Sequence, residues 1–436
     1  MNEPLDIFGQ NPRLNRLYTQ LCFCFALEDS TVDGTPIVEL IPRGLTRLTE
    51  SVPWISGKVS TDRSGEARII PLNDLPSLRQ KDLTNESPSF DEFRQACFPF
   101  TMMDENVIAS RNTLPSQNDS SAPVLSIQVN FVRGGMFLVV DAQHNAMDLR
   151  GQAQIIYLLS KACRGEPFSR EDIAAANISR ADVIPLLSSD EASKIQPTPK
   201  QPASSTSSGS SGVWASFSFS STALRSLKTG SAEGMTTDFV STDDVLSAFV
   251  WQCVTRARMH RLPQADAHST FERQVDARRH LGISEAYTGN VTCKVSVTLA
   301  PKGIVQSPLG GIASKLREAI SYQADLGLQT RLAATQLHQS LQNPTKTTSQ
   351  SRPKVSSTDV KMSSWAKEDC YNFDFGGPLG KPEAVRRPRF EGWEGLAYMM
   401  PKRSDGEIAV ALCLRVEDLQ ALKSDELFNE FSRYIG

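Results

Sequence analysis

The stretch LSIQVNFVRGGMFLVVDAQHNAMD at residues 125–148 decides the fold. Apolar and polar residues alternate over 125–131, which is the pattern of a half-buried strand, and the RGG that follows supplies a hairpin turn into a second, apolar strand. Beyond Asp148, apolar residues recur at helical spacing until Gly165 and Pro167 end the helix. His144 therefore lies in a strand-to-helix turn, where a rigid sheet can present a side chain to a substrate.

This turn alone supports two interpretations of His144 and Asp148. A single histidine at a strand end is more often structural than catalytic, and an aspartate at the start of a helix is a good N-cap. A catalytic interpretation needs support from other parts of the chain.

Length and composition exclude several classes of protein. At 436 residues the chain is longer than one hydrophobic core usually serves, so two domains are expected. The formal net charge is -3 without a dense basic block, which argues against nucleic acid or an anionic membrane as the main partner. The 8 cysteines form no C-x-x-C pair and no metal-ligand spacing with histidine, which predicts reduced core residues and no metal site.

The chain carries no sign of a membrane segment or a signal peptide. No apolar run reaches the roughly 18 residues of a membrane span, and the acidic opening MNEPLD lacks the basic and then apolar pattern of a leader. A soluble, cytoplasmic protein is expected.

One seam divides the sequence. Residues 198–212 are almost entirely Pro, Ser, Thr, Gln and Gly, a composition that cannot form a core and that predicts a crossover linker. The linker would join an N-terminal domain at 1–197 to a C-terminal domain at 213–436. Strand-like and helix-like segments interleave in the second half, which favours mixed α/β architecture: 213–219, 242–258, 291–299, 309–323 and 408–416.

Four further segments give the turn at His144 a context. They are STDDVLSAFVW at 241–251, VDARR at 275–279 with YTGN at 287–290, SSW at 363–365, and DFGGPLGKP at 374–382. In this order, after His144-x-x-x-Asp148, they resemble the BAHD acyltransferase family over nearly the whole chain. The opening DIFGQ and the segment GKPEAVRRP at 380–388 are most similar to the fungal branch typified by trichothecene 3-O-acetyltransferases.

The resemblance implies a fold and a reaction. The fold would be two similar α/β domains of the chloramphenicol acetyltransferase kind, each a mixed sheet flanked by helices, with a channel between them. His144 matches the histidine at the middle of that channel and would act as general base. An imidazole with a pKa of about 6.5 can take the proton of an attacking hydroxyl and return it to the departing thiolate, so direct transfer without an acyl-enzyme is expected.

The resemblance also implies the substrates and the oligomeric state. The donor would be acetyl-CoA or another acyl-CoA, and the acceptor a hydroxyl of a fungal secondary metabolite, either a polyketide or a terpenoid. Relatives in the family are usually monomers, so a monomer is expected. The sequence does not identify the acceptor or the length of the acyl chain.

The resemblance assigns roles to further residues. Asp148 would pair with Arg278, and Asp374 would support the architecture of the channel. Ser363 and Trp365 are candidates to bind the oxyanion or the acceptor. Candidates for the phosphates of coenzyme A are Lys294, Lys381 and Arg386. Each candidate also has a plain structural interpretation as a cap, a core residue or a solvated surface charge.

Two alternatives to a coenzyme A-dependent enzyme remain. One is a condensation-like catalyst that takes its acyl group from a carrier protein, although Gln143 and Leu149 stand where its H-H-x-x-x-D-G motif has histidine and glycine. The other is an inactive binding protein of the same fold, although His144, Asp148 and Arg278 are all present. The chain departs from the wider family at Leu149 and at Gly377, where plant members have glycine and tryptophan, and this puts a plant-type pocket in doubt.

Overall fold

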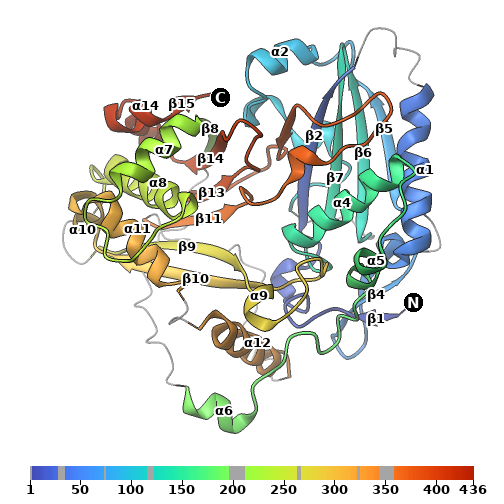
Figure 1. The fold of residues 1–436 in the computed structure, drawn as a ribbon, viewed down its shortest axis with the longest axis horizontal. Helices are drawn as coiled ribbons and strands as arrows, with labels where there is room; N and C mark the ends of the chain where they lie inside the picture. Colours follow the sequence, from blue (N-terminus) through green and yellow to red (C-terminus); the bar gives the residue numbers. More distant parts are fainter. Residues whose placement is uncertain are drawn as a thin grey trace.

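The computed structural model describes residues 2–27, 35–72, 75–114, 122–195, 212–262, 267–321, 325–342 and 358–436. Of the expected linker at 198–212, only Gly212 lies inside the described residues. Figure 1 shows two sheets side by side, each with helices packed against it. The expected mixed α/β architecture is confirmed.

The first sheet holds the turn at His144. It has five strands in the order β12-β2-β7-β6-β5, and β2, β7 and β6 are antiparallel neighbours. Helices α1 and α4 pack against each other beside it, followed by α5. The elements are β2 (Tyr18–Ala26), α1 (Thr35–Ser51), β5 (Ser77–Asp82), α2 (Phe90–Gln95), α3 (Glu105–Ile108), β6 (Leu125–Val132), β7 (Gly135–Gln143), α4 (Leu149–Cys163), α5 (Arg170–Ala176) and β12 (Ala384–Arg386). A small sheet of β1 (Glu3–Pro4), β4 (Ala67–Pro71) and β3 (Gly57–Thr61) lies near the N-terminus at the right of Figure 1, and α6 (Ser189–Lys194) follows α5.

The second sheet has seven strands in the order β10-β9-β11-β13-β14-β8-β15. Its elements are β8 (Val213–Phe219), α7 (Ser221–Gly230), α8 (Thr242–Arg258), β9 (Ser269–Asp276), α9 (Arg278–Leu281), β10 (Thr292–Leu299), α10 (Pro301–Gln306), α11 (Leu309–Glu318), α12 (Leu326–Gln342), β11 (Val360–Ser364), β13 (Leu396–Met399), β14 (Ile408–Leu414), α13 (Val416–Lys423), α14 (Glu426–Phe431) and β15 (Arg433–Tyr434). None of the described helices is both long and apolar enough to cross a membrane.

Helix α8 is the centre of the second half. Ser241 and Asp244 form a capping box at its N-terminus, which satisfies two backbone N–H groups there. The helix is buried on nearly all sides, and its Trp251 indole donates to Ser269 Oγ at 2.9 Å on strand β9. A helix that is covered on most of its circumference belongs inside a layered fold.

The two faces of the second sheet pack against different partners. Phe217, Val410 and Leu412 belong to the core cluster of α8, whereas Trp214 and Ala411 belong to the cluster of the first sheet. This alternation follows from the two-residue period of a strand. One face of the second sheet thus packs against the helices of its own half, and the other face packs against the first half of the molecule.

One expectation for strand β6 is wrong. The alternation at 125–131 predicted one solvent-exposed face, but the side chains of Ser126, Gln128 and Asn130 are buried. Asn130 donates to Ile108 O at 2.8 Å and Gln128 donates to Val107 O at 3.0 Å, so the segment around α3 covers this face. A polar residue in a strand can face covered backbone instead of water, and the period alone does not separate the two cases.

A segment from the second half returns to the first sheet. Strand β12 pairs with β2, with Val385 opposite Phe23. Just before it, the Phe375 ring is fully buried and lies edge-on to Phe23 and Phe25, with ring centroids 5.9 and 5.4 Å away. Residues 373–386 therefore fasten the C-terminal half of the chain to the N-terminal sheet.

We expect Phe375→Ala to lower the free energy of unfolding by about 3–5 kcal/mol, because the substitution leaves a cavity between β2 and the returning segment. Phe239→Ala is the matched control, since the Phe239 ring is 61% exposed, and it should cost about 1 kcal/mol or less. Urea unfolding followed by circular dichroism measures both. Equal losses would contradict a fastening role for Phe375.

Candidate active site

The turn that carries His144 is fixed through its backbone. The His144 N–H donates to Leu17 O at 2.7 Å, and the Ala146 N–H donates to Gln143 O at 2.9 Å. Strand β7 ends at Gln143 and α4 begins at Leu149, so the turn connects a central strand to a helix N-terminus. This is the position predicted from the sequence.

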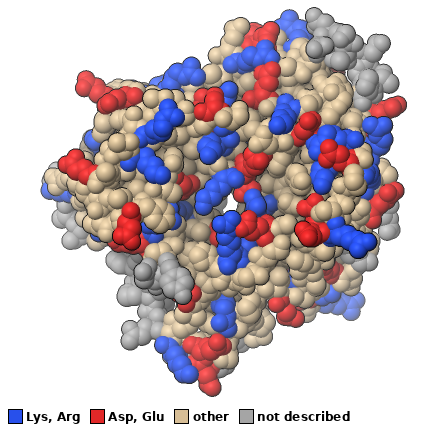
Figure 2. All heavy atoms as spheres, viewed as in Figure 1, with Lys and Arg blue, Asp and Glu red and all other residues tan. Residues whose placement is uncertain are grey.

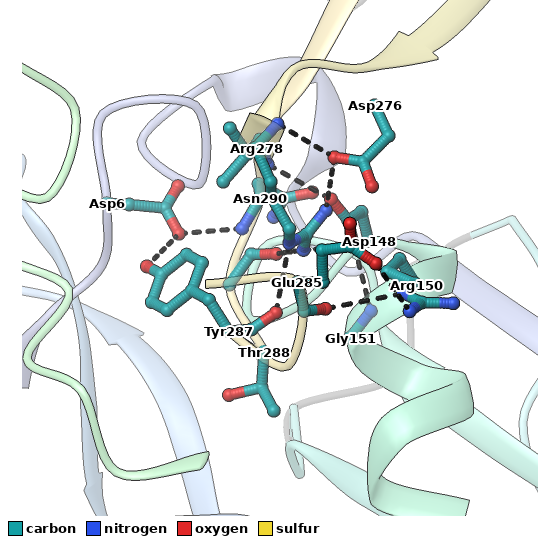
Figure 3. Close-up of polar contacts among 12 residues, drawn as sticks. Asp6, Asp148, Arg150, Gly151, Asp276, Arg278, Glu285, Tyr287, Thr288 and Asn290 are labelled. Carbon is teal, nitrogen blue, oxygen red and sulfur yellow. Dashed lines mark hydrogen bonds and ion pairs between the residues drawn. The ribbon is translucent and has the colours of Figure 1, made fainter. Parts of the chain in front are cut away.

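Asn290 joins the second half of the molecule to this turn. Its side-chain amide donates to the carbonyl oxygens of His144 at 2.7 Å and Asn145 at 2.9 Å. Its backbone N–H donates to the Asp6 carboxylate at 2.8 Å, which also accepts from the Tyr287 hydroxyl (Figure 3). Burial raises the pKa of Asp6 to about 6. Two segments far apart in the sequence, at Asp6 and at 287–290, therefore hold this turn.

Asp148 is both a helix cap and half of an ion pair. Its carboxylate accepts from the Gly151 N–H at 2.9 Å, as an N-cap does, and from the Val291 N–H at 3.0 Å. It also accepts from Arg278 Nη2 at 2.8 Å (Figure 3). The Asp148 and Arg278 side chains are 2% and 0% exposed, so water does not screen the pair.

The guanidinium of Arg278 also donates hydrogen bonds to other groups around Asp148. It donates to Tyr287 O at 3.1 Å, to Gly289 O at 2.8 Å and to the partly exposed Asp276 carboxylate at 2.9 Å. The carboxylates hold the guanidinium charged, and the pKa of Arg278 stays above its ordinary value despite the opposing effect of burial. The loop between β9 and β10 is thus bound to the start of α4.

The environment of His144 favours the neutral form of its ring. Burial lowers the pKa of the imidazole below its ordinary value, the negative charge of Asp148 opposes that effect, and the positive charge of Arg387 adds to it. The Nδ1 atom is buried and has no hydrogen-bond partner among the described residues. Nε2 is the nitrogen left for a substrate, and in a ring protonated on Nδ1 it carries the lone pair that a base needs.

The SSW segment lies at the end of β11. The Trp365 indole N–H donates to Ser363 Oγ at 3.0 Å, and its ring is buried. Ser363 pairs with Tyr398 on β13, and the Tyr398 ring meets Trp365 edge-on with centroids 5.2 Å apart. In this arrangement the Trp365 donor is already used, whereas the half-buried Ser363 hydroxyl can still donate its own hydrogen to a substrate oxygen.

Asp374 makes one local contact and one contact with the end of α4. Its carboxylate accepts from the Gly376 N–H at 2.8 Å, and its carbonyl oxygen accepts from Arg164 on α4. Gly376 has a positive φ of 68°, so the carboxylate stabilises a turn that most residues adopt poorly. These contacts fit an architectural group.

The three cations suggested for coenzyme A do not meet at one place. Lys294 is on β10 and pairs with Glu272 at 3.5 Å, with 64% of its side chain exposed. Lys381 donates to Asn372 Oδ1 at 3.1 Å. Arg386 is buried and donates to the Tyr371 hydroxyl and to the carbonyl oxygens of Phe98, Cys97 and Val385. A guanidinium occupied in this way is a poor candidate for binding phosphates.

Figure 2 shows a small opening near the centre of the face in view, with Lys and Arg side chains around it and Asp and Glu side chains close by. In the same view the opening lies between the β9–β10 hairpin and the start of α4 (Figure 1). A basic rim suits an anionic ligand, because opposite charge raises its local concentration.

The sequence alone does not predict several contacts at this junction. Asp6 and Asn290 belong to recognisable motifs, but nothing local indicates that they meet. The neutral state of His144 depends in part on Arg387, which is 243 positions away in the printed sequence. Only homologous sequences with correlated changes could have pointed to such contacts.

Comparison with known proteins decides the family. Residues 17–163 match the family model of the trichothecene 3-O-acetyltransferase-like N-terminal domain. The chain is 41% identical to trichothecene 3-O-acetyltransferase TRI101 of Fusarium sporotrichioides, and the match covers 99% of this chain and 97% of that protein. It belongs to the trichothecene 3-O-acetyltransferase-like family.

Two further members of the trichothecene 3-O-acetyltransferase-like family support this assignment. O-acetyltransferase dmxR13 of Cryptosporiopsis sp. (strain 8999) is 41% identical, over 99% of this chain and 97% of its own. The crystal structure of F. graminearum TRI101 complexed with coenzyme A and deoxynivalenol superposes with a TM-score of 0.92 at 37% identity, covering 100% of both chains. The resemblance to the fungal branch of acyltransferases is confirmed.

We expect Asp148→Ala to lower the free energy of unfolding by about 3–5 kcal/mol, because the buried Arg278 charge loses its main counterion. If Asp148 were only a helix cap, the loss would be about 1 kcal/mol. Asp276→Ala removes the other carboxylate bound to Arg278, which is 43% exposed, and should cost about 1 kcal/mol or less. Urea titration of the three proteins separates these cases, and similar losses for both variants would contradict the buried-pair account.

Proposed function

We propose that the protein is an acetyl-CoA-dependent O-acetyltransferase that acts on a hydroxyl group of a fungal secondary metabolite, with His144 as general base. The observation that carries the proposal is a histidine fixed at a strand-to-helix turn by residues of both halves, with a pKa that burial lowers. The full-length similarity to named O-acetyltransferases supports the reaction type.

The proposed chemistry uses one proton and one histidine. His144 Nε2 takes the proton from the acceptor hydroxyl while the oxygen attacks the thioester carbonyl, and a tetrahedral intermediate forms. When the carbon–sulfur bond breaks, the imidazolium returns the proton to the coenzyme A thiolate. The products are the acetyl ester and free coenzyme A, and no acyl-enzyme is needed.

The remaining residues have supporting roles in this proposal. Asp148 and Arg278 fix the turn, and Ser363 is the better of the two candidate oxyanion or acceptor ligands because the Trp365 N–H is already engaged. Asp374 stabilises a turn of the segment that returns to the first sheet. For the phosphates of coenzyme A, Lys294 and Lys381 are more accessible than Arg386.

The division of the chain at 198–212 also belongs to the proposal. We infer that residues 1–197 and 213–436 form the two halves of one channel, with β12 as an exchange from the second half to the first sheet. The cytoplasmic location and the monomeric state remain predictions from the sequence and from the family resemblance.

We expect His144→Ala to reduce acceptor-dependent release of coenzyme A thiol from acetyl-CoA by about 10²–10⁴-fold, the usual contribution of a general base. A panel of hydroxylated polyketides and terpenoids supplies the acceptors, and a thiol reagent measures release. His260→Ala is the matched control, because His260 is exposed at the end of α8 and should leave the rate unchanged. Release that survives in His144→Ala would overturn the mechanism, and transfer only from a carrier-bound acyl group would favour the condensation-like alternative.

The pH dependence follows from the lowered pKa of His144. The neutral, basic ring is present above that pKa and is lost as the pH falls through it, so kcat/KM should rise with pH along a single acid limb. Because the pKa is lowered, the midpoint of this limb should lie below about 6.5, the value of an unperturbed histidine. Initial rates between pH 5 and 8 at low acceptor concentration locate it, and a midpoint above that value would argue against His144 as the titrating base.

A further inference from the structure

Arg387 is a buried cation enclosed by aromatic rings. It follows β12 and is 2% exposed. The centre of its guanidinium lies 4.3 Å from the Phe390 ring centroid, 5.0 Å from that of Tyr398 and 5.8 Å from that of Trp365. Ring faces attract a cation, which fixes the guanidinium without using its N–H groups.

Most donors of Arg387 are unused. Nη2 donates to Thr113 Oγ1 at 2.8 Å, and Nε is buried with no hydrogen-bond partner among the described residues. No described carboxylate forms an ion pair with this guanidinium, although four other buried arginines have such a pair: Arg180, Arg258, Arg273 and Arg278. An uncompensated buried charge is costly, and such groups concentrate where function uses them.

The contacts of Arg387 place it beside the turn at His144. Thr113 accepts from the Tyr18 N–H at 3.0 Å through its carbonyl oxygen, and Tyr18 lies opposite Gln143 in the β2–β7 pair. The preceding residue, Leu17, accepts from the His144 N–H. The partner of Arg387 and the turn at His144 are therefore both attached to the start of strand β2.

The aromatic rings around Arg387 come from the opposite side of the site. Trp365 follows β11 and Tyr398 lies on β13, both in the seven-stranded sheet. These rings adjoin Ser363, the candidate for contact with the substrate oxygen. Arg387 thus lies where the first sheet, with its histidine, meets the second sheet, with its hydroxyl donors.

The charges that act on His144 come from both sides. Asp148 favours the protonated imidazole, whereas Arg387 disfavours it. Glu105, a buried acid, accepts from the Thr113 hydroxyl at 2.7 Å; burial raises the pKa of its carboxyl, and the positive charge of Arg387 opposes that shift. Burial has the largest effect on the pKa of His144, and the charge of Asp148 acts on the ring more strongly than the charge of Arg387.

We propose that Arg387 is the fixed positive charge of the acyl-transfer site, with N–H groups available to the thioester oxygen as that oxygen becomes negative. It also acts through His144 as a positioning charge that keeps the ring in its basic form. Preorganised donors stabilise an oxyanion in this way without reorganising during the reaction. This inference rests on the proposed function and adds a residue to it.

The test compares Arg387→Met, Arg387→Lys and Thr113→Val. In histidine-labelled protein, NMR titration gives the pKa of His144 directly, with His144→Ala to assign its signal. Arg387→Met should raise that pKa by about 0.5–1 unit and lower kcat by about 10²–10³-fold. Arg387→Lys should restore the pKa but only part of kcat, because an ammonium keeps the charge and loses the planar fork.

Thr113→Val is the matched control, because it removes the hydrogen bond of Arg387 and keeps the charge. It should leave the pKa of His144 nearly unchanged and cost less in kcat than Arg387→Met. Equal losses of kcat in both variants, with an unchanged pKa of His144, would show that Arg387 has only a structural role and would overturn the inference. If Arg387→Met does not fold, an unchanged kcat in Arg387→Lys would overturn it, and a fall of about tenfold or more at constant KM would support it.

The two proposals fail separately. The NMR titration needs neither an acceptor nor turnover, so a shifted pKa in Arg387→Met supports the electrostatic role even if no acceptor is found. Loss of acyl transfer as an activity of the wild-type protein would instead contradict the proposed function.

Discussion

The buried pair of Asp148 and Arg278 is the constraint on which the site depends. It binds the first turn of α4 to the loop between β9 and β10, and this same loop carries Asn290, which holds the carbonyl oxygens of the His144 turn. Replacing either residue alone destabilises the fold, because the other would remain as an uncompensated charge at a buried contact. The stability of the fold and the placement of His144 are therefore coupled. The ion pair fixes how the two halves of the molecule lie against each other at the site proposed for the reaction.

The first sheet supports this junction through an unusual covered face. Gln20, Asp141 and Gln143 are fully buried on β2 and β7, and Asp141 accepts from the Ser110 N–H and hydroxyl at 2.9 and 2.6 Å. Burial raises the pKa of Asp141 to about 7. Asp141 and Gln20, which donates to Arg111 O, specify the path of the segment at 104–113 more precisely than apolar contacts would, because each would lose its partner if the segment were misplaced. That segment carries Thr113, and through it the position of Arg387.

Local patterns predicted the parts of the fold that arise from local physics. The hairpin at 133–135, the helix after Asp148 and the capped helix α8 follow from periodicity and capping, which act within a few residues. The covered face of β6 was not predictable, because residues distant in the sequence cover it. The neighbouring residues Arg386 and Arg387 are a second example. The guanidinium of Arg386 donates to backbone carbonyl oxygens, whereas most N–H groups of Arg387 have no partner. This difference depends on tertiary structure and cannot be read from the sequence. Family resemblance supplied the pairing of Asp148 with Arg278, which spacing alone could not.

The electrostatic balance at His144 explains why both a carboxylate and a guanidinium lie near it. A general base must be neutral before the reaction and cationic during it, so an environment that strongly favours either state would slow one of the two steps. Burial and Arg387 favour the neutral ring, and Asp148 moderates that preference. During attack the ring gains a positive charge while the thioester oxygen gains a negative one. A guanidinium that opposes the first change assists the second, so its net effect on the transition state depends on which charge it lies closer to. The free N–H groups of Arg387 favour the oxygen, since a donor that reaches the oxyanion acts by hydrogen bonding as well as by charge.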